Sequence, residues 1–210
     1  MILPTNKDFW DKFRKTNGAL SVTEAIAIIN IASQAPKGGW AIELGTFNGK
    51  SSMAAMLGLP KCFFMLLDPI FEDDKIIDEV YENIKDVNPE IALKFSPTYS
   101  TDFLPKLAPY SYVFVDSGSH QDGLPMQEVK LLEDNMLQGG IIAFHDWNSQ
   151  FSEVKEASDY LVGTGKYDYI DIPWQEIIEY VNANNLEDNN LSWHHNELKN
   201  PCFVGALRRK

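Results

Sequence analysis

Short apolar segments that alternate with helical segments constrain the fold of this chain more than any other feature. Between residues 41 and 144, each strand-like segment except the last is followed by residues with helical spacing. Strands that alternate with helices in this way predict a parallel sheet with helices on both faces. The expected strands are 41–44, 63–67, 91–95, 112–115 and 141–144, and the expected helices between them are 51–57, 72–86, 102–107 and 126–137.

Two helices are expected before this alternating region. Phe9, Trp10 and Phe13 fall on one face of a short helix. A second helix starts at Ser21, where Ser21-Val22-Thr23-Glu24 fits a capping box. In a capping box, each of the two polar side chains satisfies a free amide at the start of the helix.

The end of the chain departs from the alternating pattern. A helix around 151–161 is followed by strands at 167–172 and 202–207, with an irregular stretch, 173–201, between them. A final antiparallel strand inserted into an otherwise parallel sheet fits this arrangement. We therefore expect one α/β domain, a doubly wound Rossmann-like sheet, over residues 1–210: N-terminal helices at 1–38, a core at 40–148, and a C-terminal helix, an insertion and two strands at 149–210.

Composition restricts the partners of the chain. The formal net charge is −12, so a polyanion would meet general repulsion and nucleic acid is a poor candidate. No apolar run is long enough to cross a bilayer, and the N-terminus lacks the pattern of a signal peptide. Cys62 and Cys202 show no framework spacing and are expected to be reduced thiols of a cytoplasmic protein. A homo-oligomer stays open.

The first expected strand ends in a glycine-rich turn, Glu43-Leu44-Gly45-Thr46-Phe47-Asn48-Gly49. Gly45 allows a sharp turn, and Gly49 allows the next helix to pack closely against the strand and a ligand. The free amides at that helix start favour electron-rich groups, which fits a nucleoside cofactor. The alternative is a tight strand-to-helix turn that binds nothing.

Asp68 follows the second expected strand. A carboxylate there can accept hydrogen bonds from both ribose hydroxyls of an adenosine, in NAD or in S-adenosylmethionine (SAM). The alternative is a helix cap or a loop carboxylate before Pro69.

The fourth and fifth expected strands also end in polar residues: Asp116 and His120 after one, His145 and Asp146 after the other. Neighbouring strand ends would bring these side chains into one cleft. Asp116, His145 and Asp146 could bind a divalent cation such as Mg²⁺, or His120 or His145 could act as a general base. The alternative is that they bond to loop backbones.

Together these residues resemble the class I SAM-dependent methyltransferases. The closest branch is that of small-molecule O-methyltransferases, with the macrolide sugar methyltransferases and the cephalosporin-hydroxylase-like proteins. The resemblance covers residues 41–148, and its matching segments, in order, are AIELGTFNGKSS, LLDP, SPTYSTDFLPKL, YVFVDSGSH and LLEDNMLQGGIIAFHDWN. It implies a seven-stranded sheet whose last strand is antiparallel.

The resemblance also implies roles for individual residues. Glu43, Gly45, Gly49 and Ser51 match the loop that holds the methionine portion of SAM. Thr98-Tyr99-Ser100 stands where relatives have Gly-Asp-Ser, and only Ser100 matches. Some relatives bind Mg²⁺ at the counterparts of Asp116, His145 and Asp146, with an acid in place of His145. The cofactor residues expected are Glu43, Gly45, Thr46, Phe47, Asn48, Gly49, Ser51, Asp68, Ser100 and Asp116.

The expected reaction is methyl transfer from SAM to a hydroxyl of a small-molecule acceptor, with Asp116, His120, His145 and Asp146 as candidate catalytic residues. The acceptor pocket could be lined by Trp147, Trp174, Trp193 and the pair His194-His195, and the alternative for these residues is core packing or a surface loop. Three alternatives stay open. They are a nicotinamide-dependent oxidoreductase, a non-catalytic binding or scaffold protein, and a metal hydrolase. The first fits less well, because Glu43-x-Gly45-x-x-x-Gly49 differs from the G-x-G-x-x-G pattern of dinucleotide-binding turns.

Overall fold

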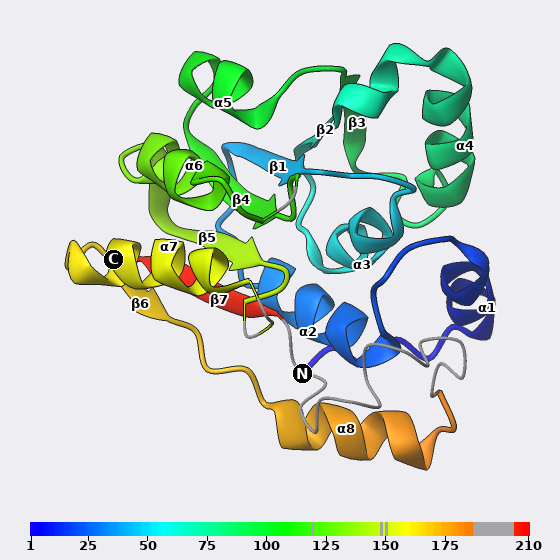
Figure 1. The fold of residues 1–210 in the computed structure, drawn as a ribbon. Helices are drawn as coiled ribbons and strands as arrows, with labels where there is room; N and C mark the ends of the chain where they lie inside the picture. The colour runs from blue at the N-terminus through cyan, green and yellow to red at the C-terminus, as the bar shows by residue number, and fades with distance from the viewer. Residues whose placement is uncertain (119, 148, 150, 187–203) are drawn as a thin grey trace.

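A computed structural model describes residues 1–118, 120–147, 149, 151–186 and 204–210. Within these residues the chain forms a seven-stranded sheet in the order β3-β2-β1-β4-β5-β7-β6 (Figure 1). Five neighbouring strands are parallel, and β7 lies antiparallel between β5 and β6. The strands are β1 Trp40–Leu44, β2 Phe63–Leu67, β3 Ala92–Ser96, β4 Tyr110–Val115, β5 Met136–Phe144, β6 Tyr167–Tyr169 and β7 Gly205–Arg209. The α/β Rossmann-like sheet with a late antiparallel strand is confirmed.

The first four helices cover one face of the sheet (Figure 1). They are α1 Lys7–Lys15, α2 Val22–Ala32, α3 Lys50–Gly58 and α4 Asp74–Ile84, which follows a short 3₁₀ turn at Pro69–Glu72. Phe9, Trp10 and Phe13 of α1 are buried as expected, and the capping box of Ser21 and Glu24 is present. Because α2 is apolar on nearly every side, it needs cover on both flanks.

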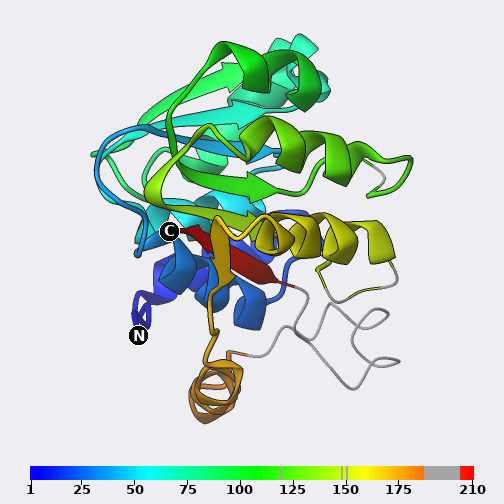
Figure 2. The ribbon, with the colours of Figure 1, turned by 90° about the vertical axis from the view of Figure 1, so that its left-hand side faces the viewer.

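The opposite face carries α5 Ser100–Phe103, a 3₁₀ turn at Leu104–Lys106, α6 Leu124–Leu132 and α7 Ser152–Gly163 (Figure 2). Alternate strand residues enter the two cores: on β4, Tyr112 and Phe114 pack with α2 and α3, whereas Val113 and Val115 pack with α6 and α7. This period of two is the reason that the central strands are apolar throughout.

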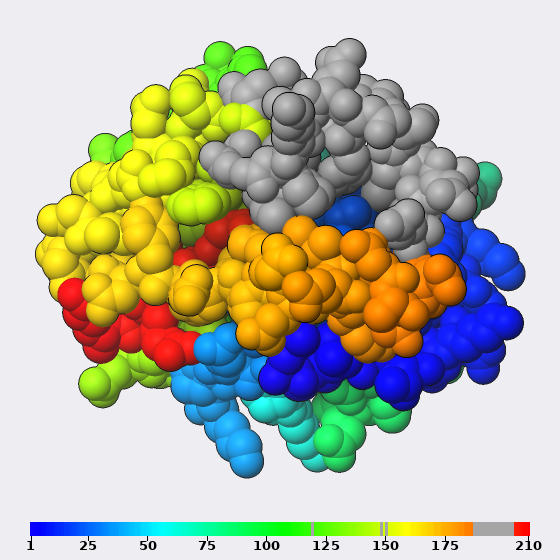
Figure 3. Space-filling model, turned by 90° about the horizontal axis from the view of Figure 1, so that it is seen from below, coloured from blue at the N-terminus to red at the C-terminus, as the bar shows by residue number. Residues whose placement is uncertain are grey.

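An additional helix, α8 Trp174–Ala183, corrects the expectation of an irregular stretch after residue 173. It packs on α2 through Ile177 and Val181, so it forms an outer layer over a helix instead of over the sheet. Figure 3 shows it beside the N-terminal segment, where the Tyr180 hydroxyl donates to the Pro4 carbonyl at 3.1 Å. The spacing of Trp174, Ile177 and Val181 is helical and could have indicated this element.

Some boundaries also differ from the expectation. The helix expected over 126–137 ends at Leu132, because Met136 already pairs with Tyr110 as the first residue of β5. The strand expected over 167–172 ends at Tyr169. The division into N-terminal helices, core and C-terminal part stays a prediction. Among the described residues, no helix is both long and apolar enough to cross a membrane.

Candidate functional site

The carboxyl ends of four parallel strands meet at one edge of the sheet. Backbone hydrogen bonds extend the strand register by one residue there: Gly45 donates to Leu67 at 2.8 Å, Asp116 to Leu44 at 2.9 Å, and His145 to Val115 at 3.0 Å. The polar residues that follow these strands are therefore held side by side. In open α/β sheets, ligands bind at this edge.

Two adjoining cavities open along this edge. The larger cavity, of about 400 Å³, extends from the turn after β1 to the polar residues after β4 and β5. The smaller, of about 340 Å³, lies between the turns that follow β2, β3 and β4. Both are lined by Gly45, Asp68 and Gly118, so the two cavities meet at these three residues. Of the expected site residues, the larger cavity is lined by Gly45, Thr46, Phe47, Asn48, Ser51, Asp68, Asp116, His120, His145 and Asp146.

The turn after β1 requires glycine at two places. Gly45 has φ +82°, and a Cβ there would lie 2.2 Å from the carbonyl oxygen of Asp116. Gly49 has φ +79° at the start of α3, and its Cβ would lie 3.0 Å from Val80. Both positions need the left-handed backbone region and a close approach, which only glycine allows without strain. Gly45 thus permits the ends of β1 and β4 to lie in contact.

Glu43 lies beneath the turn and does not line either cavity. It is fully buried, and its two carboxylate oxygens accept hydrogen bonds from the hydroxyls of Ser51 and Ser52. It therefore ties the first turn of α3 to β1. Thr46, unlike Glu43, lines the larger cavity, and its buried hydroxyl has no hydrogen-bond partner among the described residues. Such an atom is costly unless a ligand or water satisfies it.

Glu43 should make stability depend on pH. Burial raises the pKa of Glu43 from 4.5 to about 8, although the hydrogen bonds from Ser51 and Ser52 lower it. Between these pH values the folded state holds a proton that the unfolded state releases. The contribution of Glu43 is therefore complete below pH 4.5 and is lost as the pH rises towards 8, by up to about 1.4 kcal/mol per pH unit.

The test is urea unfolding of the wild type and of Glu43→Gln across this pH range. The variant stays neutral, so its free energy of unfolding should fall less steeply with rising pH. A residual slope of the same sign is expected from Glu128, because burial raises its pKa to about 7. Glu90→Gln, at an exposed position, serves as the control and should keep the wild-type slope. An unchanged slope in Glu43→Gln would show that this carboxyl ionises normally.

Asp68 joins the two cavities. One of its carboxylate oxygens accepts the backbone N–H of Phe47 at 2.8 Å, and the other accepts that of Ile70 at 3.1 Å. These bonds connect the turn after β1 to the turn after β2 and hold the carboxylate in one orientation. Asp68 is thus also a cap of the 3₁₀ turn, as the alternative interpretation expected.

Ser100 lines the smaller cavity from the start of α5. Its hydroxyl and that of Ser117 both donate to the same oxygen of Glu128, a buried residue of α6. Glu128 therefore connects the turns after β3 and β4 on the wall of this cavity. The sequence analysis missed this carboxylate, because in sequence it is one polar residue of an amphipathic helix.

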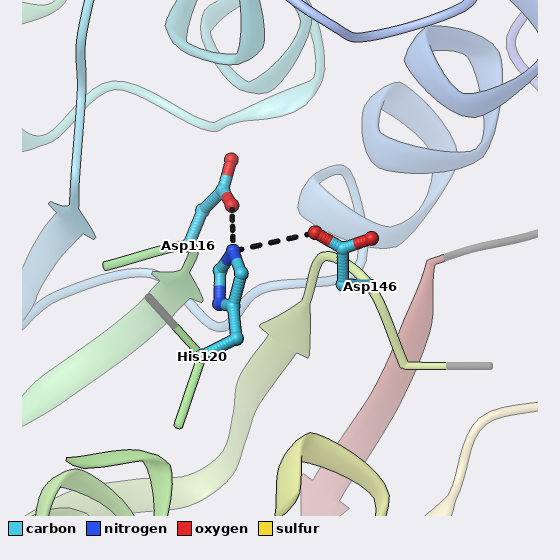
Figure 4. Close-up of side chains that lie close together, drawn as sticks. All are labelled: Asp116, His120 and Asp146. Atoms are coloured by element: carbon cyan, nitrogen blue, oxygen red, sulfur yellow. Dashed lines mark ion pairs between the residues drawn. The ribbon is translucent and has the colours of Figure 1, made fainter. Parts of the chain in front are cut away.

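Three polar side chains that line the larger cavity lie close together: Asp116, His120 and Asp146 (Figure 4). Nε2 of His120 lies 3.3 Å from a carboxylate oxygen of Asp116 and 3.3 Å from one of Asp146. One ligand atom from each of the three residues lies within 4.8 Å of the other two, so the group could hold a metal ion. In this group His120 stands where the sequence analysis expected His145.

His145 contacts the same two aspartates as His120. Its Nδ1 is 3.1 Å from Asp146 and 3.4 Å from Asp116, and its Nε2 is 3.8 Å from Glu24 of α2. Burial lowers the pKa of His145, but the surrounding carboxylates outweigh burial and raise it well above 6.5. For Asp116 the effects have the opposite sign: burial alone would raise its pKa, but the two histidines lower it to about 2. Asp116 and the two imidazoles therefore favour each other's charged forms.

Backbone strain is concentrated at the site. Phe47, His120 and Asp146 line the larger cavity and have φ between +48° and +55°. Only two further non-glycine residues in the described part of the chain have positive φ. Such conformations cost about 1–3 kcal/mol each and gather at functional sites. Their location here is consistent with a binding or catalytic role for this edge.

Other expected residues lie elsewhere. The Trp147 indole donates to Ser158 at 2.8 Å and packs against Gly205, so it anchors the turn after β5 to α7 and β7. Neither Trp147 nor Trp174 lines either cavity. Trp193, His194 and His195 lie outside the described residues. Conversely, the cavity wall includes Lys50 and the α1–α2 connection at residues 17–20, which no sequence pattern singled out.

The comparisons with known proteins support the fold. No family model matches the sequence, and no curated protein matches it significantly. Many solved structures match the fold. The O-methyltransferase TomG from Streptomyces achromogenes, solved with SAM, has 15% identity and a TM-score of 0.60, covering 80% of this chain and 84% of its own.

Two further structures illustrate the range. An O-methyltransferase from Bacillus cereus, solved with SAH, has 13% identity and a TM-score of 0.59, over 80% of this chain and 85% of its own. An rRNA methylase from Streptococcus thermophilus has 10% identity and a TM-score of 0.56, over 87% of this chain and 93% of its own. The chain thus has the fold of the class I SAM-dependent methyltransferases.

Proposed function

We propose that this protein is a SAM-dependent methyltransferase that methylates a hydroxyl of a small-molecule acceptor. The observation that carries the proposal is the pair of adjoining cavities with Asp68 on the wall of both. A carboxylate in that position suits a ribose, with the adenine in the smaller cavity and the methionine portion in the larger one. The unpartnered hydroxyl of Thr46 is a ready hydrogen-bond donor for the methionine end.

The chemistry follows from the same layout. SAM supplies a methyl group on a sulfonium, and the acceptor oxygen must lose its proton as the new bond forms. Positioning of the acceptor against the methyl group provides much of the rate. The polar cluster on the wall of the larger cavity is where an acceptor hydroxyl would lie. There Asp116, His120 and Asp146 would orient the hydroxyl, and the neutral form of the His120 imidazole would receive its proton.

The donor set of Asp116, His120 and Asp146 also fits a divalent cation. Such an ion would lower the pKa of the acceptor hydroxyl. Because one donor is an imidazole, we expect Mn²⁺ or another transition metal to bind better than Mg²⁺. Calorimetric titration of the protein with Mn²⁺ and with Mg²⁺ tests this preference, and His120→Ala should lose it.

We propose a small acceptor in place of RNA, although an rRNA methylase is among the structural neighbours. The net charge is −12, and three aspartates line the larger cavity, so a polyphosphate chain would be repelled along the site. A cytoplasmic location and a homo-oligomer stay predictions.

The deciding experiment is isothermal titration with SAM, with SAH and with NAD, followed by a methyl-transfer assay on a panel of small hydroxyl compounds. We expect SAM and SAH to bind and NAD not to bind. Preferential NAD binding would favour an oxidoreductase. SAM binding without transfer to any acceptor, unaltered by a chelator or by added metal, would favour the non-catalytic alternative.

Asp68→Ala should weaken SAM binding about 100-fold, because two charge-assisted hydrogen bonds of about 1.5 kcal/mol each would be lost. Asp73→Ala is the matched control. Asp73 also caps a helix through a backbone N–H, that of Lys75, but it lines neither cavity. Calorimetry on both variants measures the difference. If Asp68→Ala and Asp73→Ala had equal affinities for SAM, Asp68 would not be a ribose ligand.

A further inference from the structure

Glu24 is a buried carboxylate with two different environments. It is the third residue of α2 and is fully buried. Its Oε2 accepts the backbone N–H of Ser21 at 2.9 Å and the Ser21 hydroxyl at 2.8 Å. Its Oε1 has no hydrogen-bond partner among the described residues. Helix capping therefore accounts for only one of the two oxygens.

The second oxygen faces His145. The distance from Glu24 Oε1 to Nε2 of His145 is 3.8 Å, and this Nε2 is also buried without a hydrogen-bond partner among the described residues. On the other side of the ring, Nδ1 contacts Asp146 and Asp116. The imidazole thus lies between α2 and the polar cluster of the cavity, with carboxylates at both nitrogens.

Two buried polar atoms of complementary type at this distance define a hydrogen bond that a shift of under about 1 Å would complete. Leaving both unsatisfied is unfavourable, whereas a charge-assisted bond between them is strong. A proton on Nε2 would point at Glu24, and a hydrogen bond to this residue of α2 would then fix the orientation of the ring. The turn that leads into α2 at residues 17–20 lines the same cavity.

We propose that Glu24 is a positioning residue for the reaction: it accepts the Nε2–H of His145 and fixes the ring so that Nδ1 faces Asp116 and Asp146. This inference rests on the proposed function for its catalytic meaning, but the contact itself does not.

The test compares Glu24→Gln with Ser21→Ala. The glutamine keeps the side-chain length and an oxygen that can accept from Ser21, but it places an NH₂ group, which cannot accept the Nε2–H, towards His145. Ser21→Ala removes the cap at the same helix start and leaves Glu24 Oε1 in place. The Ser21→Ala cap loss costs about 1 kcal/mol, so this variant controls for a merely structural effect.

The readout is the nuclear magnetic resonance signal of the His145 ring nitrogens in the ligand-free protein, assigned with His145→Asn. In the wild type we expect a slowly exchanging Nε2–H proton. It should persist in Ser21→Ala and disappear or shift strongly in Glu24→Gln. Where an acceptor turns over, Glu24→Gln should lower kcat at least tenfold with the Kd for SAM unchanged, and Ser21→Ala should stay within twofold.

Several outcomes would overturn the proposal. One is a wild-type His145 with no proton on Nε2, a result that does not depend on whether Glu24→Gln folds. Another is a ring signal that moves equally in both variants. Failure of SAM binding in the wild type would instead remove the proposed function and leave the Glu24–His145 contact intact.

Discussion

Replacing Gly45 with alanine should abolish detectable SAM binding and lower the free energy of unfolding by about 3 kcal/mol. Two costs add at this residue. A non-glycine residue at φ +82° is strained, and the new Cβ would lie 2.2 Å from the Asp116 carbonyl oxygen. Because the atoms that this Cβ would meet belong to the backbone of Asp116 and Ser117, they cannot move without separating β1 from β4. Urea unfolding and calorimetric titration with SAM measure the two effects.

Gly165→Ala is the control that has the backbone strain of a positive φ without a steric clash of the new Cβ. Gly165 has φ +75°, but a Cβ there would meet nothing within 4 Å. We therefore expect about 1 kcal/mol of destabilisation and unchanged SAM binding, since Gly165 lines neither cavity. If Gly45→Ala behaved like Gly165→Ala in both measurements, the close approach of β1 and β4 would be unimportant for the site.

Asp116→Asn should lower the rate of methyl transfer about 100-fold or more with little change in SAM affinity. Asp116 contacts both His120 and His145, and it lines the larger cavity. Without this carboxylate the two imidazoles lose a shared counter-ion, and the amide would place its NH₂ group or a weaker acceptor against them. The measurement is kcat and KM on any acceptor from the panel that turns over.

Tyr112→Phe is the control on the same strand. The Tyr112 hydroxyl is buried without a partner among the described residues and lines neither cavity. Its removal should leave kcat unchanged and stability equal or slightly higher, because an unsatisfied polar group is lost. A kcat for Asp116→Asn close to that of Tyr112→Phe would exclude Asp116 from the reaction.

Local sequence patterns predicted most of the fold. Alternating strands and helices, the Ser21 capping box and the late antiparallel strand all follow from spacing along the chain, and the structure has each of them. The missed α8 shows a limit of this approach. Its helical stripe is short, and its apolar face is covered by another helix, which no local pattern reveals.

The site was predictable to the extent that it lies at strand ends. Asp68, Asp116, His120, His145 and Asp146 each follow a buried strand, and the parallel sheet brings them to one edge. Their individual contacts were not predictable. The metal site predicted from Asp116, His145 and Asp146 stays a prediction, and the group of donor atoms close enough to hold an ion contains His120 with the same two aspartates.

The sequence by itself determined the α/β class, the turn glycines and the polar residues that end the strands, because these depend on backbone conformation within a few residues. Only the tertiary structure decided that Glu43 braces α3 from beneath the site, that Glu128 joins two turns, and that Glu24 faces His145. In each of these contacts the carboxylate reaches a different element: Glu43 reaches from β1 to α3, Glu128 from α6 to the turns after β3 and β4, and Glu24 from α2 to the end of β5. Such partners are chosen by packing in three dimensions, which spacing along the chain does not encode.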